Sequence, residues 1–331
     1  MSLTFAWRGR RFSKSWQTKT APGDVRASSI LLSTKTLHAT LSARRCIAGH
    51  NIKMIVACSI DRRFAELAGV MLYSLEENGG IPDAQIFILA DGLLASDKDM
   101  LQACARRKLN FIDIEGDLLS RISRLRTTSY WSRATYARLY LPQLLADRHC
   151  RMLYLDADTL IKKSLAPLFE LPLAGKAVAA VPYDDPTRFN EPLARAASTP
   201  YFNAGVLLVD IDAWNAQDYT PRISKLLQSR SFDFLDQDVL NIATEGNFVH
   251  LAGCWNAQKG WEDYSEASIV HFTHAKPNTV ECEHPEKAIF LEYRKQTPWR
   301  SARLVTNRDR RVRTLLLSIR KKWRRLSAFA R

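Results

Sequence analysis

The chain contains neither of the glycine-rich motifs that hold nucleotide phosphates in dehydrogenases and P-loop proteins. Its 13 glycines form no Gly-x-Gly-x-x-Gly and no Gly-x-x-x-x-Gly-Lys-Ser/Thr. Because such loops let the backbone approach a phosphate closely, their absence argues against a dinucleotide-dependent oxidoreductase and a P-loop NTPase. The six cysteines form no Cys-x-x-Cys pair. The sequence therefore indicates neither a zinc site nor a disulfide framework, and it is typical of a reducing compartment.

Long apolar runs are also missing. No stretch approaches the about 18 apolar residues that are needed to cross a bilayer, and the N-terminal region lacks the uninterrupted apolar core of a signal peptide. Residues 1–52 show no helical or strand period. We expect them to form a poorly ordered basic extension of a cytoplasmic protein.

Acidic residues are scarce at both ends of the chain. Residues 1–53 hold ten Lys or Arg against one acid, residues 301–331 hold eleven against one, and residues 54–300 hold 27 against 32. A nucleic-acid enzyme more usually carries its positive charge on the folded body. Basic tails are compatible with RNA and equally with an anionic membrane surface, and we expect no nucleic-acid partner.

Short apolar runs alternate with helical patterns from residue 53 to residue 300. This order predicts a single α/β domain with a mostly parallel central sheet covered on both faces. Helices are expected at 64–75, 97–108, 131–141 (ending at Pro142), 224–227 and 237–244. Strands are expected at 53–59, 85–90, 109–114, 152–155, 177–181, 203–210 and 268–272.

The stretch Tyr154-Leu-Asp-Ala-Asp-Thr-Leu-Ile161 is the most informative part of the sequence. It places Asp156 and Asp158 one residue apart at the carboxyl end of a buried strand. On an extended backbone, such positions point the same way and would aim both carboxylates at one spot. Their repulsion favours a divalent cation between them, and hard oxygen ligands suit Mg²⁺, Mn²⁺ or Ca²⁺. An Asp-x-Asp pair also arises by chance about once in a chain of this length.

Other polar residues lie at expected strand or helix ends. Asp61 follows the first strand, where a carboxylate would bind a base or ribose or would instead cap a helix. His271 closes a late strand; as a metal ligand it would favour Mn²⁺, and the alternative is a satisfied core histidine. Asp236 and Gln237 begin a helix, where an acid is favourable in any case. Arg138 would reach a carboxylate or phosphate if its helix faces the cleft.

Six blocks in this order resemble glycosyltransferase family 8, whose members are retaining, metal-dependent transferases that use nucleotide sugars. The group includes bacterial lipooligosaccharide galactosyl- and glucosyltransferases. The resemblance spans roughly residues 53 to 300. The blocks are ATYARLYLP (134–142), RMLYLDADTLI (151–161), YFNAGVLLVDIDAWN (201–215), LDQDVLNIA (235–243), CWNAQKGW (254–261) and VHFTHAKP (270–277).

The resemblance implies a Rossmann-like nucleotide-sugar-binding domain of the glycosyltransferase A type and a role for each matching residue. Asp156, Asp158 and His271 would hold Mn²⁺, with Mg²⁺ as the alternative, on the diphosphate of a UDP-sugar. Gln237 would lie beneath the anomeric carbon, with Asp236 not excluded as a nucleophile. Donor contacts would come from Ser59, Asp61, Arg138, Asp184, Asn203 and Lys276.

Two positions depart from the family pattern. His274-Ala-Lys276-Pro-Asn278 lacks the usual Gly before Lys-Pro and the usual Trp after it, and this affects the acceptor side of the cleft. Arg63 stands where some relatives have Asn beside the ribose.

The implied function is transfer of galactose or glucose from a UDP-sugar to a saccharide acceptor of the lipopolysaccharide or lipooligosaccharide type. Because Gln237 is a poor nucleophile, front-face attack by the acceptor hydroxyl is favoured over double displacement. One alternative is a non-catalytic membrane- or RNA-binding protein built on a degenerate transferase body, and a second, closer one is an inverting transferase.

The C-terminal segment 301–331 repeats apolar residues every three or four positions between basic ones. Such a basic amphipathic helix is typical of a membrane interface; the alternative is a helix that docks on its own domain. A lipid-linked acceptor on the inner face of the cytoplasmic membrane would fit this anchor. The apolar positions are Val312, Leu315, Ile319, Trp323, Leu326 and Ala330.

Overall fold

The structure is a computed structural model, and it describes residues 54–125, 133–309 and 311–312. The predicted N-terminal extension and nearly all of the predicted amphipathic C-terminal helix lie outside these residues. Among the described residues, no helix is both long enough and apolar enough to cross a membrane.

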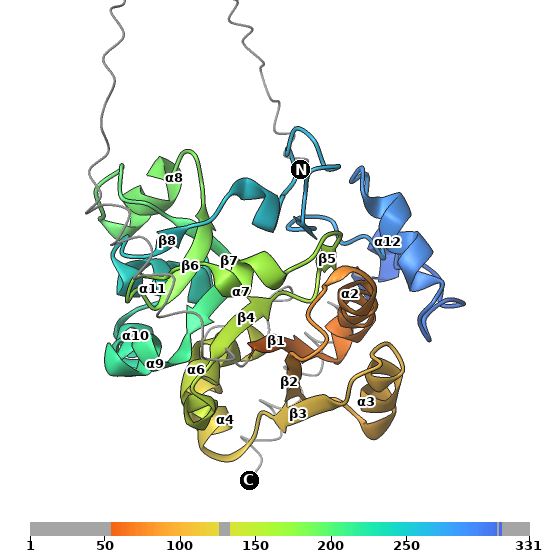
Figure 1. The fold of residues 1–331 in the computed structure, drawn as a ribbon, viewed down its shortest axis with the longest axis horizontal. Coiled ribbons are helices and arrows are strands. Elements are labelled where there is room, and N and C mark those ends of the chain that lie inside the picture. The colour runs from red at the N-terminus through yellow and green to blue at the C-terminus, as the bar shows by residue number, and fades with distance from the viewer. Residues whose placement is uncertain (1–53, 126–132, 310, 313–331) are drawn as a thin grey trace, which may run out of the picture. The chain divides into compact units, whose positions relative to one another are not determined.

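A seven-stranded sheet forms the centre of the fold, in the order β3-β2-β1-β4-β7-β6-β8 (Figure 1). Strands β1 to β4 are parallel neighbours, and β6 is parallel to β8. Strand β7 is antiparallel to both β4 and β6. The expected mostly parallel α/β sheet is confirmed. The strands are β1 (Met54–Asp61), β2 (Gln85–Asp91), β3 (Leu109–Asp113), β4 (Arg151–Leu155), β6 (Val178–Pro182), β7 (Phe202–Asp210) and β8 (Val249–His250).

Both faces of the sheet are buried, which explains why its strands are continuous apolar runs. Along β1, Ile55 and Ala57 belong to one core cluster, and Val56 and Cys58 belong to the other. This alternation follows from the two-residue period of a strand. Each face of the sheet therefore has its own hydrophobic core.

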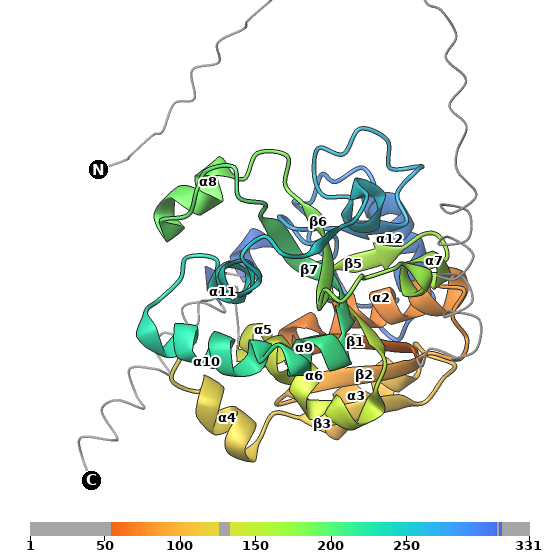
Figure 2. The same cartoon turned by 60° about the vertical axis from the view of Figure 1, so that its left-hand side comes forward.

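Helices cover the two faces in separate layers (Figure 2). The layer over Val56 contains α2 (Ala65–Asn78), α3 (Ala95–Gln102), α7 (Ala166–Glu170) and α12 (Lys287–Arg294). The layer over Ile55 contains α4 (Gly116–Ile122), α5 (Arg133–Ala137), α6 (Leu141–Leu144), α8 (Thr187–Asn190), α9 (Ile211–Ala216), α10 (Tyr219–Ser229) and α11 (Leu235–Thr244).

Two predicted helices are shorter than expected. The described part of the 131–141 pattern is α5 followed by a 3-10 turn, Arg138–Tyr140, and Pro142 lies at the start of α6 instead of ending a helix. Proline fits there because the first turn of a helix has no use for its missing N–H. Helix α3 ends at Gln102 rather than at residue 108.

The late strand that carries His271 is not part of the central sheet. Strand β9 (Ile269–His271) pairs antiparallel with β5 (Thr159–Ile161), which places His271 directly opposite Thr159. The prediction that His271 lies at the end of a strand in the parallel sheet was therefore wrong. A short apolar run does not encode its partner, and this pairing brings His271 beside the Asp-x-Asp segment.

The chain remains attached to the domain beyond residue 300. The Val305 N–H donates to the Asn278 carbonyl, and the Val280 N–H donates to the Val305 carbonyl, each at 3.0 Å. Residues 278–280 belong to the loop that follows Lys276. The start of the C-terminal segment is therefore part of the folded body.

Candidate functional site

A cleft of about 1190 Å³ opens at the carboxyl ends of β1 and β4. Its walls come from segments that are far apart in the sequence. All of the sequence-predicted site residues line it: Ser59, Asp61, Arg138, Asp156, Asp158, Asp184, Asn203, Asp236, Gln237, His271 and Lys276. Ligands of open α/β sheets bind at this edge.

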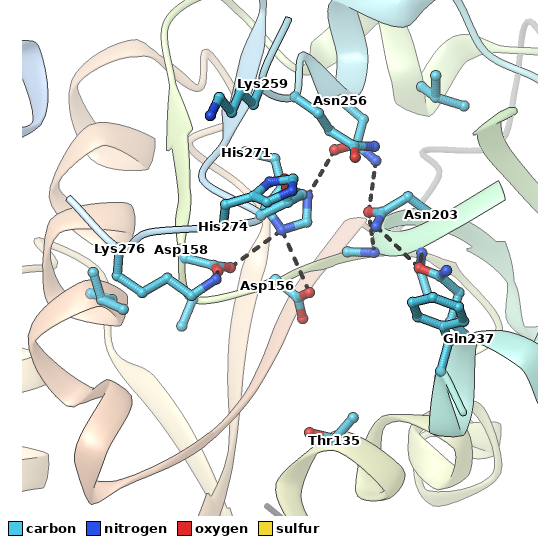
Figure 3. A pocket seen from close by; sticks show the side chains of 18 of the residues that line it. Thr135, Asp156, Asp158, Asn203, Gln237, Asn256, Lys259, His271, His274 and Lys276 are labelled. Carbon is cyan, nitrogen blue, oxygen red and sulfur yellow. Dashed lines mark hydrogen bonds and ion pairs between the residues drawn. The ribbon is translucent and has the colours of Figure 1, made fainter. Parts of the chain in front are cut away.

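Asp156, Asp158 and His271 meet at the centre of the cleft (Figure 3). One ligand atom from each lies within 4.8 Å of the other two. His271 Nε2 is 3.4 Å from Asp158 Oδ1 and 3.7 Å from Asp156 Oδ2. The two carboxylates do not converge through the pleat of an extended strand, as the sequence suggested. Strand β4 ends at Leu155, and the Thr159 N–H closes a turn on the Asp156 carbonyl at 3.1 Å.

Two further residues shape this group for a cation. His271 is buried, and its Nδ1 is 2.9 Å from Asn256 Oδ1, an acceptor for an Nδ1–H, while its Nε2 faces the two carboxylates. Gly205 on β7 provides the space: a Cβ there would meet His271 Cε1 at 2.1 Å and Asp156 Oδ2 at 2.8 Å. Two carboxylates and an imidazole are a donor set that suits Mn²⁺.

Lys276 forms an ion pair with Asp158, and it also donates to the Phe272 carbonyl at 2.9 Å. Burial alone would raise the pKa of Asp158, but the charge of Lys276 and the contact with His271 outweigh it and hold this pKa below its usual range. Asp158 is therefore ionised near neutral pH. His271 is buried beside it, as a core histidine would be, and its Nε2 also faces both carboxylates.

Arg138 joins the group of Asp156, Asp158 and His271 to the floor of the cleft. Its Nη1 is 2.9 Å from Asp156 Oδ1, and its Nε is 2.9 Å from Asp236 Oδ2. All three residues come from different elements, and Arg138 and Asp236 are almost fully buried. Burial raises the pKa of Asp236 to about 7, with Arg138 opposing this rise and Asp156 adding to it. A buried carboxyl with so high a pKa is typical of a functional site.

Gln237 is held by hydrogen bonds on both ends of its amide. Its Oε1 accepts from Asn203 Nδ2 at 3.1 Å and from the Ala204 N–H at 3.2 Å. Its Nε2 donates to the Tyr201 hydroxyl at 3.1 Å. Asn203 Oδ1 in turn accepts from Asn256 Nδ2 at 3.1 Å, so one network runs from Gln237 to His271 (Figure 3).

The residues predicted at the nucleotide have local partners of their own. Ser59 Oγ donates to the Ala134 carbonyl at 2.7 Å. Asp61 caps the turn after β1 by accepting from the Arg63 N–H at 2.8 Å, and it also pairs with the Arg63 guanidinium. The capping role considered for Asp61 is thus present, while the side chain still lines the cleft. Asp184 is an exposed lining residue.

Sequence reasoning missed Asn256 and Gly205. Asn256 lies in a short 3-10 turn, Gly253–Asn256, and Gly205 lies inside β7. The signal for Gly205 was available, because glycine in a strand interior often marks a close approach by another group. No comparable signal marks Asn256, whose partner is fifteen residues away in the sequence.

Comparison with known proteins decides the family. The model of "Glycosyl transferase family 8" matches residues 55–302. The chain belongs to this family. The hexosyltransferase class predicted from the sequence is thereby confirmed, and the family as a whole uses UDP-sugar donors and a divalent metal.

Individual relatives are distant but extend over most of the domain. General stress protein A of Bacillus subtilis is 24% identical over 75% of this chain and 95% of its own length. Lipopolysaccharide 1,3-galactosyltransferase of Salmonella typhimurium is 26% identical over 76% of this chain and 81% of its own. The structure of galactosyltransferase LgtC with donor and acceptor sugar analogs covers 75% of this chain and 99% of its own, with a TM-score of 0.65 and 23% identity. This likeness confirms the glycosyltransferase A-type fold.

Proposed function

We propose that this enzyme is a retaining transferase that moves galactose or glucose from a UDP-hexose to a saccharide of the lipopolysaccharide type. The observation that carries the proposal is the convergence of Asp156, Asp158 and His271 Nε2 in the cleft of a family 8 domain. The Salmonella relative, named for a lipopolysaccharide galactosyl transfer, supports the acceptor class.

Asp156, Asp158 and His271 would hold Mn²⁺, with Mg²⁺ as the alternative. When bound, such an ion acts as a Lewis acid that neutralises negative charge on the leaving diphosphate. Lys276, which pairs with Asp158, would contact the same phosphates. Asn256 fixes His271 so that its free nitrogen points toward the carboxylates.

The sugar subsite is proposed to consist of Arg138, Asn203, Asp236 and Gln237, with Asp184 at its open side. Gln237 presents an amide, which is a poor nucleophile, and both ends of this amide are fixed by neighbours. Asp236 is held by Arg138 at 2.9 Å. These contacts favour attack by the acceptor hydroxyl on the face of the sugar that the diphosphate leaves, with a diphosphate oxygen taking the proton.

The uridine subsite is proposed at Ser59 and Asp61, at the carboxyl end of β1. Ser59 keeps a lone pair for a ligand while it donates to Ala134. Asp61 would accept from the base or ribose if Arg63 shifts, since the two side chains are paired without a ligand.

The enzyme is proposed to work at the inner face of the cytoplasmic membrane. The support is the sequence of residues 301–331, with eleven basic residues against one acid, and the lipid-linked nature of the proposed acceptor. Each Lys or Arg near an anionic leaflet adds about 1 kcal/mol of attraction.

The test is a screen of UDP-galactose, UDP-glucose and UDP-N-acetylglucosamine for Mn²⁺-dependent release of UDP, followed by NMR of the product made with a saccharide acceptor. We expect UDP release from a hexose donor and an α-linked product. A β anomeric proton would refute the retaining mechanism and the role of Gln237. Absence of Mn²⁺-dependent UDP release with every donor would refute the donor assignment.

A further inference from the structure

Two basic side chains of the cleft wall have no acidic partner within the described part of the chain. Arg188 on α8 and Lys259 in the loop after Asn256 both line the cleft and are exposed to it. Neither forms an ion pair or side-chain hydrogen bond among the described residues; the Arg188 guanidinium lies 4.5 Å from the centre of the Phe189 ring. The other basic lining residues, Arg63, Arg138 and Lys276, each pair with an aspartate.

These two cations line the same cleft, and their charges reach one side chain in it. The pKa of His274, which also lines the cleft, is lowered by burial and then by the charges of Lys259, Lys276 and Arg188. Figure 3 shows Lys259 and His274 on the side of the pocket that carries Lys276, with Gln237 on the other side. Arg188 approaches from α8, which lies away from β1 and the proposed uridine end in both ribbon views.

Nearby acids neutralise this positive rim only in part. Asp185 precedes α8, its Oδ1 accepts from the Thr187 N–H at 3.0 Å, and it does not line the cleft. Its charge attracts that of Arg188, but the two side chains form no ion pair. Asp184 does line the cleft, and the proposed function assigns it to the donor sugar. A substrate group that brings negative charge would therefore find Arg188 and Lys259 available.

The donor alone does not account for these charges. A sugar nucleotide carries two negative charges on its diphosphate. A divalent ion, Lys276 and Arg138 would bring four positive charges against the two negative charges of Asp156 and Asp158, while Asp236 is uncharged below its raised pKa of about 7. Two positive charges then remain to match the diphosphate. Arg188 and Lys259 are surplus to that requirement. Since a surplus cation lining a substrate cleft is most strongly stabilised by a charged hydrogen-bond acceptor, the expected ligand is a phosphate or carboxylate.

We propose that Arg188 and Lys259 bind an anionic group on the acceptor, so that the enzyme selects a phosphorylated or acidic saccharide over a neutral one. The inference rests on the proposed function, because it places an acceptor in this cleft. It adds a specificity that the family assignment does not contain. Arg188 suits a phosphate through two N–H groups of its planar guanidinium, and Lys259 contributes a point charge.

The experiment uses the full chain saturated with UDP and Mn²⁺, so that the diphosphate site is filled. Glucose 6-phosphate and glucose are titrated into this complex by calorimetry, as probes that differ in one phosphate. We expect the wild type to bind the phosphorylated sugar at least about tenfold more tightly, as charge-assisted hydrogen bonds allow. The preference should shrink between 0.05 M and 0.5 M salt because screening shortens the reach of the charges.

In the double variant Arg188→Gln with Lys259→Gln, both sugars should bind with similar, weak affinity, while UDP affinity stays within about twofold of the wild type. Lys225→Gln serves as the matched control, since Lys225 is exposed on α10 and lies outside the cleft. It should retain the preference.

Equal binding of both sugars by the wild type would overturn the proposal, and so would a preference that survives in the double variant. A parallel loss of UDP affinity would assign the two cations to the donor diphosphate and also overturn it. Failure of the wild type to bind UDP with Mn²⁺ would instead refute the proposed function. This binding is measured separately, before any sugar is added.

Discussion

At the scale of single residues, Asp156 and Asp158 carry the strongest prediction. Asp156→Asn or Asp158→Asn removes one ligand charge from the group at His271, and each should abolish most Mn²⁺-dependent UDP binding while the fold persists. Calorimetry of UDP with and without Mn²⁺ checks this, and circular dichroism checks the fold. Asp99→Asn, an exposed acid on α3, is the control. Unchanged Mn²⁺ dependence in both variants would contradict the site.

The buried carboxyl of Asp236 gives a prediction of pH dependence. Its pKa rises from the ordinary 3.8 to about 7, so between these values the folded chain holds a proton that the unfolded chain has lost. Stability contributed by this group therefore falls as the pH rises from about 4 to 7, and it levels off above.

The amide in Asp236→Asn cannot titrate, so the free energy of unfolding of this variant should depend less on pH between about 4 and 7. Denaturant unfolding in metal-free buffer at pH 5 and pH 7.5 measures this free energy for both proteins. We expect the wild type to lose at least about 1 kcal/mol more than the variant, since one pKa unit corresponds to about 1.4 kcal/mol. Parallel curves for the two proteins would show that Asp236 is ionised throughout.

At the scale of elements, Gly205 shows how a strand makes room for the site. A methyl group there would collide with the His271 ring and the Asp156 carboxylate, so Gly205→Ala should push both ligands apart. We expect Mn²⁺ affinity to fall at least about tenfold with a small change in melting temperature, because the displaced side chains face the open cleft. Manganese titration and thermal unfolding separate the two effects. Native affinity in this variant would mean that the ligand set is wrong.

The sequence predicted most strands and the cleft residues, but not how the elements pair. Apolar runs such as those of β1 and β4 indicate buried strands. Because the strands are parallel, the residues that follow them lie at the same edge of the sheet. Strand direction is a different matter: nothing in the run 203–210 shows that β7 is antiparallel. The position of His271 depends on the β5–β9 pairing, which is set by the whole fold.

The sequence could assign site roles only to residues in the segments that resemble the family. Asn256 lies within the quoted block CWNAQKGW, yet its contact with His271 could not be read from either segment alone. Arg188 and Lys259 stand outside the predicted set because exposed cations carry no signal in one sequence. A role for these two residues is suggested only by the structure, in which α8 and the loop after Asn256 line the same cleft.

At the scale of the whole molecule, the charge of residues 301–331 predicts membrane attachment. Deletion of residues 313–331 should reduce co-sedimentation with anionic vesicles at low salt, because both electrostatic attraction and apolar burial are lost. Turnover of a soluble acceptor should change less than about twofold. Vesicle binding by the truncated protein equal to that of the full chain would show that the anchor lies elsewhere.

The deletion of residues 313–331 leaves residues 303–309 intact. A longer deletion, of residues 301–331, serves as the comparison. Arg303 pairs with Asp309 at 2.7 Å, and Val305 lines the cleft. We expect the longer deletion to lower activity as well as vesicle binding.

The backbone pairing of Val305 with Asn278 and Val280 has a mechanical consequence. Two hydrogen bonds join the segment that leads to the C-terminus to the loop that follows Lys276. Tension applied to the chain beyond Val305, as by a tether to a surface, would pass directly into that loop. The load would reach the proposed diphosphate contact before it reached the central sheet.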